Sequence, residues 1–561
     1  MPRELITVQV GQCGNQIGCR FWELALREHS AHSPDFTFDD SMSTFFRNED
    51  ACGRACHVGS STDRLRARAV LVDMEEGVVN RVSKGPLGGL FDSTEFVTDV
   101  SGAGNNWAYG YAHCGPLYGE RVMEQVRRQA ERCDSLQSFF LLHSIGGGTG
   151  SGLGTYILGQ LADHFPLVCR FATSVFPSED DDVITSPYNA ILSASELIKH
   201  ADCVMPVENQ ALMDICNRIE ATTEASHRTQ KKKRGGAGVH GALLAGTSIA
   251  EVARSWRVGS GRAGSSSSAS ASGSGARAAR QKRQGGGGEQ SDARAKPRGM
   301  KVKVDASCDA SSRPLSRPSS RGGGRELGLE EALTRGTAVA HDGGSAYDAM
   351  NTVAAHLLTN LTASMRFDGT LNVDLNEITT NLVPFPHVNF VMTAIAPLGV
   401  PADVQMRSGS KRVERAIDAC FDRRNQLIRA DPLRSTYLAS ALLLRGNVTV
   451  TDVGRNIERI KRAGTMQMAW WNTDGFKVGL CSAPPYTQGG AAQGFNKTRK
   501  QASRGGGRGG GGGCAGATQL DERFSVLSLS NNCAIRHTLR TLRDRVMVLY
   551  RVRAHVHHYT E

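Results

Sequence analysis

The sequence lacks any hydrophobic run close to the ~20 residues that a helix needs to cross a bilayer. Its first residues, MPRELITVQV, have neither the basic start nor the apolar core of a secretory signal. The 14 cysteines show no regular spacing that would indicate a disulfide framework. These absences predict a soluble protein of the reducing cytoplasm, with no membrane as a partner.

The chain also lacks an even distribution of charge. Its formal net charge of +11 would ordinarily suggest a nucleic acid or an anionic membrane as partner. Residues 228–325, however, carry 21 Lys or Arg against 5 Asp or Glu, and residues 488–518 add five basic side chains and no acidic one. The rest of the chain is acidic, so we do not expect nucleic acid as the main partner. The basic segments could attract any polyanion, or could be plain low-complexity surface insertions.

Short β-rich runs alternate with amphipathic stretches over roughly the first two hundred residues, a pattern typical of a parallel sheet flanked by helices. The expected strands are Leu5–Val10, Ala69–Asp73, Ser138–Ser144, Val168–Val175 and Asp202–Val207. The expected helices are Gln16–His29, Gly119–Cys133, Gly152–Phe165 and Tyr188–His200. Ligands of open parallel sheets bind at the carboxyl edge, so the loops after these strands are the expected site.

From about Thr222 to Ser345 the composition turns to Gly, Ser, Ala and Arg, which predicts a disordered insertion. Order resumes at Tyr347–Met365, where apolar residues around much of the helix predict a central, buried element. A second α/β region follows, interrupted by a Gly/Arg-rich tract. Its expected strands are Asn389–Ile395, Tyr437–Leu444, Phe476–Cys481 and Ser525–Leu529, and its expected helices are Val413–Cys420, Val453–Lys461 and Ala534–Val552.

The string SIGGGTGSG, Ser144 to Gly152, stands between an apolar run and a helical stretch. Only glycine lets several backbone amides approach an anion closely, and the following helix adds its partial positive charge, so this run predicts a phosphate cradle. No GKS or GKT triplet follows, and the glycines do not fit GxGxxG. Alone, the run could be a flexible turn. Two further glycine loops, GQCGNQ and SGAGNNWAYG, follow other strand-like segments and should converge on the same site.

Six motifs then occur together: VQVGQCGNQIGCRFWE, LVDMEEG, SGAGNNWA, GGGTGSG, SPYNAIL and LNVDLNEITTNLVPFP. In this order they resemble the tubulin superfamily, over nearly the whole chain except the two low-complexity segments. The resemblance implies an α/β, tubulin/FtsZ-like fold. Its expected parts are a Rossmann-like GTP-binding domain (1–221), the basic insertion (222–345), a central helix completing the nucleotide site (346–366), and a smaller second domain (367–561) with a loop at 487–518.

Within the superfamily, GCRFWELALREH, SPYN, RADPLRSTYLA and HVHHY are most similar to epsilon-tubulin, with delta-tubulin the nearest alternative. The resemblance to that class implies a role in centrioles and basal bodies. Two features differ from the family pattern. Residues 399–412 lack the aromatic residue usual in the loop that makes lateral contacts, and the chain stops after HVHHYT, where further terminal helices are expected.

The resemblance also implies the ligands, GTP and Mg²⁺, and their binding residues. The residues expected to contact phosphate are Gln12, Cys13, Gln16, Ala103, Gly104, Asn105, Ser144, Gly148, Thr149 and Gly150. Asp73 and Glu75 match the carboxylates that approach magnesium, although acids at a strand end can also be merely solvated.

The nucleoside is expected to contact four further residues. Asn209 and Asn351 match the family's guanine readers, since an amide both donates and accepts, and Tyr347 would stack on the base. Asp182 falls in the ribose-contacting loop, where Ser186 replaces the family's usual glutamate.

Hydrolysis in the family uses carboxylates from the next subunit of the filament. The corresponding segment is LNVDLNEITTN, with Asp374 and Glu377 three residues apart on one helical face. Glu377 is expected to activate water at a neighbour's nucleotide, or else is simply an exposed helix residue. Whether the chain turns over GTP is left open.

The function expected from these residues is that of a structural tubulin of the microtubule cytoskeleton. Its expected partners are other tubulins, through the nucleotide face and the Asp374/Glu377 face, and centriolar or basal-body proteins. The expected location is the cytoplasmic cytoskeleton, at the centriole, centrosome or basal body. The alternatives are a monomeric regulatory GTPase, a delta-tubulin-like subunit, and a polyanion-binding module built on residues 228–325.

Overall fold

The computed structural model describes residues 3–33, 37–50, 52–62, 64–178, 181, 183–234, 346–398, 410–486 and 523–560. All of them belong to the first of two units, Met1–Arg257 with Gly336–Glu561, and the second unit, Val258–Arg335, lies outside the described residues. Most of the predicted basic insertion, the Gly/Arg-rich loop and most of the predicted lateral loop therefore also lie outside them.

The amino-terminal half is built on a parallel sheet of six strands, in the order β5-β4-β1-β6-β7-β8. Its strands are β1 (Glu4–Val10), β4 (Ala69–Asp73), β5 (Phe96–Thr98), β6 (Leu136–Ser144), β7 (Cys169–Phe176) and β8 (Cys203–Glu208). Both faces are covered, which explains why β1 and β4 are buried along their whole length. The predicted α/β fold and its parallel sheet are confirmed.

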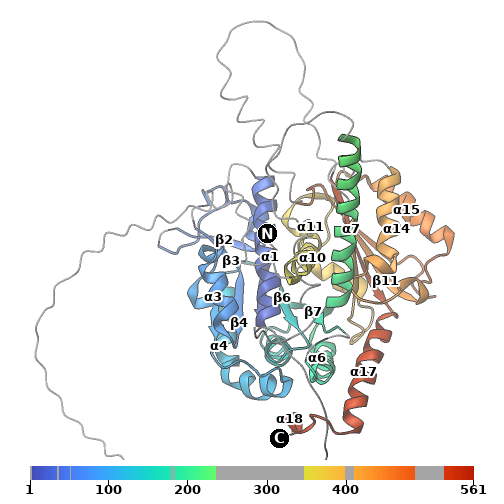
Figure 1. Cartoon of the computed structure of the whole chain (residues 1–561). Helices are drawn as coiled ribbons and strands as arrows, with labels where there is room; N and C mark the ends of the chain where they lie inside the picture. The colour runs from blue at the N-terminus through green and yellow to red at the C-terminus, as the bar shows by residue number, and fades with distance from the viewer. Residues whose placement is uncertain are drawn as a thin grey trace, which may run out of the picture. The chain divides into compact units, whose positions relative to one another are not determined.

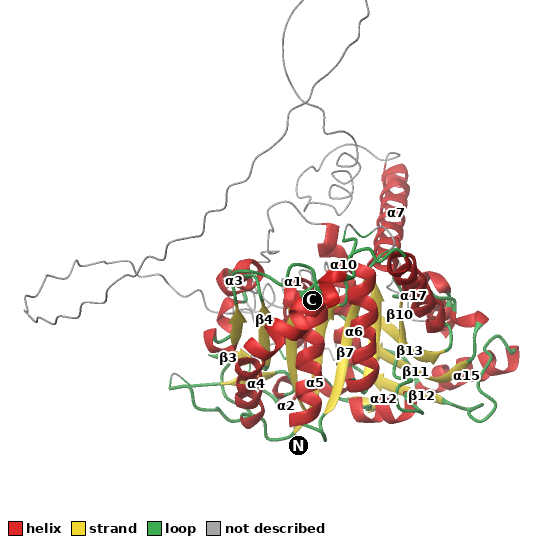
Figure 2. Cartoon of the chain, turned by 90° about the horizontal axis from the view of Figure 1, so that it is seen from below, coloured by secondary structure: helices red, strands yellow, loops and turns green. Residues whose placement is uncertain are grey.

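Helices cover each face of this sheet (Figures 1 and 2). One face packs against α1 (Gly11–His32), α3 (Glu76–Lys84), the start of α7 (Asn209–Arg234) and α10 (Ala346–Leu361). The other face packs against α4 (Gly115–Glu131), α5 (Gly154–His164) and α6 (Ser186–His200). α7 continues beyond residue 221, so the first residues of the segment predicted as disordered are helical.

The second sheet is mixed, in the order β10-β13-β11-β12-β9. Its strands are β9 (Gly369–Leu371), β10 (Met392–Ala396), β11 (Tyr437–Gly446), β12 (Phe476–Cys481) and β13 (Phe524–Asn532). One face carries α14 (Ser410–Phe421) and α15 (Val450–Ala463), and the other faces α10 and α12 (Leu375–Leu382). α17 (Ile535–Arg551) follows β13 and packs on α6, and the short α18 (His557–Thr560) follows it.

The predicted central helix lies where the two sheets meet. Figure 1 shows α10 between α1 and α7, and its apolar side chains share one core with both sheets. Backbone hydrogen bonds also join the halves, because the amide of Val204 donates to Asn389 O (2.8 Å) and that of Val391 donates to Val204 O (2.8 Å). The amino-terminal domain and the second domain therefore share a hydrophobic core.

A buried ionic cluster reinforces this junction. Glu28 of α1 accepts a hydrogen bond from Arg366 (2.6 Å) and one from Arg445 of β11 (2.9 Å), and all three side chains are at most 3% exposed. Both arginines also donate to the carbonyl of Thr359 on α10. Burial alone would raise the pKa of Glu28, but Arg445 and Arg366 hold it at about 2.

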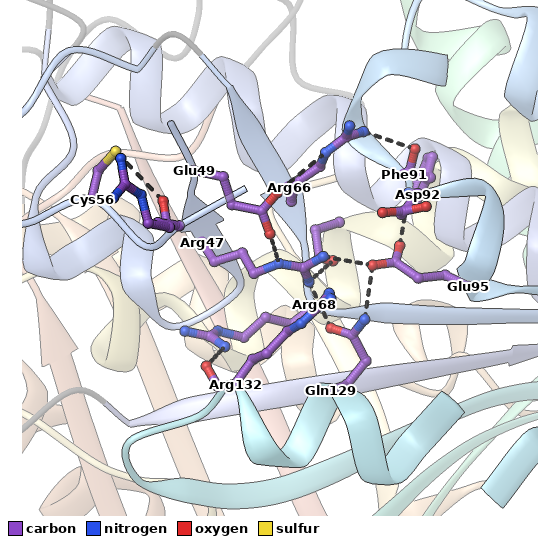
Figure 3. Close-up of polar contacts among 12 residues, drawn as sticks. Arg47, Glu49, Cys56, Arg66, Arg68, Phe91, Asp92, Glu95, Gln129 and Arg132 are labelled. Carbon is purple, nitrogen blue, oxygen red and sulfur yellow. Dashed lines mark hydrogen bonds and ion pairs between the residues drawn. The ribbon is translucent and has the colours of Figure 1, made fainter. Parts of the chain in front are cut away.

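A second polar cluster fixes the hairpin of β2 (Phe46–Asn48) and β3 (Leu65–Ala67) beside the first sheet. In Figure 3, Arg47 reaches Glu49 (2.6 Å), Glu95 (2.8 Å) and Gln129 of α4 (2.7 Å), and Gln129 in turn donates to Glu95 (2.8 Å). Since each buried charge has a charged or amide partner, the cluster can stay ionised in the interior. We assign it a structural role.

The elements expected from the sequence are present, with ends shifted by a few residues. The largest shift is at α1, which begins at Gly11 and not at Gln16. The first glycine loop is thus the first turn of the helix itself. The third loop and the glycine-rich run likewise enter wide helical turns, Tyr109–Cys114 and Thr149–Leu153, ahead of α4 and α5.

Candidate nucleotide site

The three predicted phosphate loops meet at the carboxyl edge of the first sheet, and their glycines allow the close contact. Gly11 has a φ of +74°, and a Cβ on it would lie 3.1 Å from the amide nitrogen of Gly150. A Cβ on Gly148 would lie 2.6 Å from Ala103 O and 2.8 Å from the amide nitrogen of Asn106. The Gly148 distances are too short for any side chain, and at Gly11 the tight contact adds to a positive φ that already favours glycine. The structure therefore brings the three loops together, as the sequence predicted.

The expected phosphate-contacting residues range from exposed to buried, which suits a ligand bound on the solvent side of the loops. Gln12, Gly104 and Asn105 are exposed, Cys13, Gln16, Ser144 and Thr149 are half-buried, and Ala103, Gly148 and Gly150 are buried. Gln12 and Cys13 stand in the first turn of α1, where backbone amides have no partner within the helix and the helix dipole attracts anions. Burial raises the pKa of the Cys13 thiol to about 12, so it is a neutral donor at pH 7.

Two buried side chains that the sequence analysis missed support these loops. Asn15 is fully buried, and its Nδ2 donates to Gly11 O (3.0 Å) and Val72 O (3.1 Å), which fixes the start of α1 against β4. His143, at the end of β6, contacts Gly150 O through Nδ1 (2.9 Å) and Ser174 Oγ through Nε2 (2.7 Å). A polar residue within an apolar strand was the available signal for His143.

The partners of His143 determine its tautomer. The Gly150 carbonyl can only accept, so Nδ1 carries the proton and Nε2 accepts from the Ser174 hydroxyl. Burial lowers the pKa of His143 to about 4, so the ring is neutral at pH 7. It therefore holds the glycine-rich loop without adding charge to a phosphate site.

The predicted magnesium carboxylates stand beside the same loops. Asp73 ends β4 and is 3% exposed, its Oδ2 has no hydrogen-bond partner among the described residues, and burial raises its pKa to about 6. A Cβ on Gly102 would lie 2.9 Å from Glu75 Oε1, so Glu75 lies against the third loop. An orphaned buried carboxylate oxygen next to a second carboxylate suits a hard cation that takes one or two protein oxygens.

The predicted base-contacting residues lie on two helices, α7 and α10. Asn209 opens α7, and Tyr347 and Asn351 lie in the first half of α10, which packs against both α7 and α1. Tyr347 is 54% exposed, whereas Asn351 is 8% exposed. Asp348 of α10 also pairs with Arg20 of α1 (3.4 Å), which fixes the start of α10 to the helix that opens the phosphate site.

The predicted ribose contact, Asp182, lies outside the described residues. Its neighbour Asp181 is described, and its Oδ2 accepts a hydrogen bond from Ser186 Oγ at 2.6 Å. A Cβ on Gly146 would lie 3.5 Å from the same oxygen. Ser186 occupies the position where the resemblance led us to expect a glutamate. It thus holds the Asp181 carboxylate against the glycine-rich loop.

Asp374 and Glu377 are not part of this cluster. Asp374 caps α12, accepting from the amide of Glu377 (2.7 Å), and the Glu377 carboxylate, 41% exposed, pairs with Lys477 of β12 (2.5 Å). α12 touches the opposite edge of the first sheet, because Thr379 Oγ1 lies 3.4 Å from the Sγ of Cys169, the first residue of β7. The two predicted catalytic residues therefore stand at the amino edge, across the sheet from the phosphate loops.

No helix among the described residues is both long and apolar enough to traverse a membrane.

Comparison with known proteins shows that two family models match this chain. The model of the Tubulin/FtsZ family GTPase domain matches residues 4–217, and that of the Tubulin C-terminal domain matches residues 386–544.

Individual relatives match over nearly the whole chain. The tubulin epsilon chain of Mus musculus is 39% identical over 99% of this chain and 90% of its own length, and that of Homo sapiens is 38% identical over the same shares. The tubulin alpha-3 chain of Saccharomyces cerevisiae is 28% identical over 86% of this chain and 81% of its own.

Proposed function

The chain belongs to the tubulin family, and from this we propose that it is an epsilon-class tubulin that helps to assemble or organise centriolar or basal-body microtubules. Membership of the family implies that it binds GTP and pairs with other tubulins of the cytoskeleton. The centriolar role, the magnesium site and the residue roles below are part of the proposal.

The observation that carries the proposal is the separation of the two functional faces. The phosphate loops occupy the carboxyl edge of the first sheet, and Glu377 stands at its amino edge. Glu377 therefore cannot reach the nucleotide of its own subunit. It can reach the nucleotide of a second subunit stacked head to tail on this face. Turnover is then a property of the assembled pair.

In such a pair Glu377 orients or deprotonates the attacking water. Its pairing with Lys477 restricts the position of the carboxylate on the exposed face of α12. The backbone amides at the starts of α1 and of the Thr149–Leu153 turn stabilise negative charge on the phosphates. Mg²⁺ held by Asp73 and Glu75 would add Lewis-acid stabilisation of the same charge.

The alternatives named from the sequence fit these observations less well. A monomeric regulatory GTPase would need its water-activating carboxylate beside its own nucleotide, whereas Glu377 lies across the sheet. A delta-class assignment is not supported by the relatives, since the epsilon chains of two mammals match at 38–39% identity over 99% of the chain.

The proposal is tested by measuring GTP turnover by the purified chain at increasing concentration, alone and with alpha/beta-tubulin. We expect nearly stoichiometric GTP binding throughout and a turnover per molecule that rises as the chain pairs. Sedimentation under the same conditions reports the pairing. A turnover that stays constant down to dilute, monomeric protein would contradict the proposal and favour the switch GTPase.

Asp73→Asn is expected to stabilise the nucleotide-free protein while weakening its response to Mg²⁺. The pKa of Asp73 is raised from 3.8 to about 6, so ionising the carboxylate destabilises the fold, and this cost develops as the pH rises through that range. Removing the charge should add about 3 kcal/mol to the free energy of unfolding at pH 7. The gain should shrink as the pH falls below about 6, where wild-type Asp73 is itself protonated.

The measurement is urea unfolding without nucleotide, together with GTP affinity in Mg²⁺ and in EDTA. Asp163→Asn, an exposed aspartate on α5, is the matched control and should change neither quantity. A variant whose GTP affinity gains as much from Mg²⁺ as the wild type would show that Asp73 does not hold the cation.

A further inference from the structure

A single buried amide, that of Asn189 in the first half of α6, ties the phosphate loops to the end of the described chain. The side chain is fully buried and makes four hydrogen bonds. Nδ2 donates to Asn105 O (2.8 Å) and to Gly146 O (2.9 Å), and Oδ1 accepts from the amide of Trp107 (2.8 Å) and from the hydroxyl of Tyr559 (2.7 Å). An amide offers two donor hydrogens and two lone pairs, so Asn189 is saturated.

Three of these four partners are backbone groups of the loops that form the candidate site. Asn105 and Trp107 belong to the third phosphate loop, and Gly146 belongs to the glycine-rich loop. Asn105 has a φ of +50°, in the left-handed region that asparagine tolerates better than most side-chain-bearing residues. Its carbonyl is held twice, by Asn189 and by Thr185 Oγ1 (3.2 Å).

The fourth partner, Tyr559, comes from residues 552–560, which follow α17. Its ring packs on Tyr188 with centroids 5.1 Å apart, and burial raises its pKa to about 12, so the hydroxyl keeps its proton and donates. The same segment makes three further contacts. His558 O accepts from Asn106 Nδ2 (2.9 Å), Ala554 O accepts from the Tyr188 hydroxyl (3.0 Å), and the Tyr559 hydroxyl also lies 3.5 Å from Thr185 O. The segment is thus bound both to α6 and to the third phosphate loop.

We propose that Tyr559 is a positioning residue of the nucleotide site, which acts through Asn189 to hold the third phosphate loop and Gly146 in their ligand-binding arrangement. The inference rests on GTP binding at these loops. Without the Tyr559 hydroxyl, one lone pair of a fully buried amide loses its donor, and Asn189 is free to shift toward fewer loop contacts. Docking of residues 552–560 therefore increases nucleotide affinity.

Thermodynamic linkage requires that nucleotide binding and docking of residues 552–560 favour each other equally. If the docked segment favours bound nucleotide, bound nucleotide favours the docked segment by the same factor. The nucleotide state of the site is then communicated to α17, which packs along α6 and leads directly into the segment. A partner that binds the end of α17 would sense, or change, nucleotide occupancy.

Tyr559→Phe tests the inference, because it removes only the hydroxyl. We expect the dissociation rate of GTP, measured by displacement of a fluorescent GTP analogue from the full chain, to rise about fivefold, the effect of one hydrogen bond. Tyr550→Phe is the matched control, since Tyr550 is 56% exposed on α17, and it should leave the rate unchanged. A purely structural tyrosine would lower the melting temperature of the variant without changing the dissociation rate, and that result would overturn the inference.

Amide hydrogen exchange on the wild type provides a second test that does not depend on how the variant folds. Backbone amides of residues 552–560 should exchange more slowly with saturating GTP than without it, and unchanged exchange would overturn the inference. These failures are distinct from failure of the proposed function. If the wild type binds no GTP, the proposed function is wrong, whereas normal binding with an unaltered rate in Tyr559→Phe removes only the role of Tyr559.

Discussion

Glu28→Gln should lower the free energy of unfolding by about 3–5 kcal/mol, because it leaves two buried arginines without their shared counter-charge. The Glu28 carboxylate is the acid that pairs with both Arg366 and Arg445. Glutamine keeps the shape of the side chain and one acceptor oxygen. The expected loss is therefore of charge compensation and not of packing. Urea unfolding of the GTP-saturated chain measures the effect as a shift of the transition midpoint.

Glu23→Gln provides the matched control on the same helix. Glu23 also contacts two arginines, Arg20 and Arg27, but these pairs are partly exposed, with side chains 13–20% accessible. Because water reaches these pairs, their loss should cost less than the loss of the fully buried cluster. If the two variants lose equal stability, the junction does not depend on the buried cluster and the assignment is wrong.

The same cluster predicts how stability depends on pH. The pKa of Glu28 is lowered from 4.5 to about 2, so its contribution is complete above about 4.5 and is lost as the pH falls toward 2. Glu28→Gln has already lost this contribution. The difference between wild type and variant should therefore narrow in acid and stay constant between pH 6 and 8.

The parallel sheet and the convergence of its loops could be predicted from the sequence because they follow from local patterns. Short apolar runs alternating with amphipathic ones specify a doubly covered sheet, and glycines after strands mark its carboxyl edge. The strand Ala69–Asp73 was predicted to the residue for this reason. Helix α1 was predicted too short, since Gly11 and Gly14 weaken a helical signal although Gly14 is needed where the backbone packs against Leu142 O.

The side chains that support the site could not be predicted, because their partners are distant in the sequence. Asn189 depends on Tyr559, and Glu28 depends on Arg445, contacts that exist only after the two domains have packed. Lys477 beside Glu377 is of the same kind. In each case the residue type gave no sign of its partner. The motifs predict where the ligand binds, and only the fold shows which side chains support the predicted loops.

The largest effect on activity is expected from Glu377→Ala, which should lower assembly-dependent GTP turnover about 100-fold or more, the usual contribution of a positioned general base. The variant should bind its own GTP normally, because Glu377 stands across the sheet from the phosphate loops. The decisive readout uses alpha/beta-tubulin preloaded with GTP labelled on the γ-phosphate. Wild-type chain should accelerate release of labelled phosphate from the partner, and the variant should not.

Three further variants separate catalysis from assembly. Glu458→Ala removes an exposed glutamate of α15, whose ion-pair partner among the described residues is Arg462, and should leave turnover unchanged. Lys477→Ala should reduce turnover less than Glu377→Ala, since it removes the partner of the Glu377 carboxylate but keeps the carboxylate itself. Lys477→Arg keeps a positive partner and should restore most of the lost turnover. Full turnover of the partner's nucleotide by Glu377→Ala, with pairing shown by sedimentation, would contradict a role in trans. Loss of pairing in that variant would instead make Glu377 a contact residue, whose carboxylate binds the neighbour without acting on water.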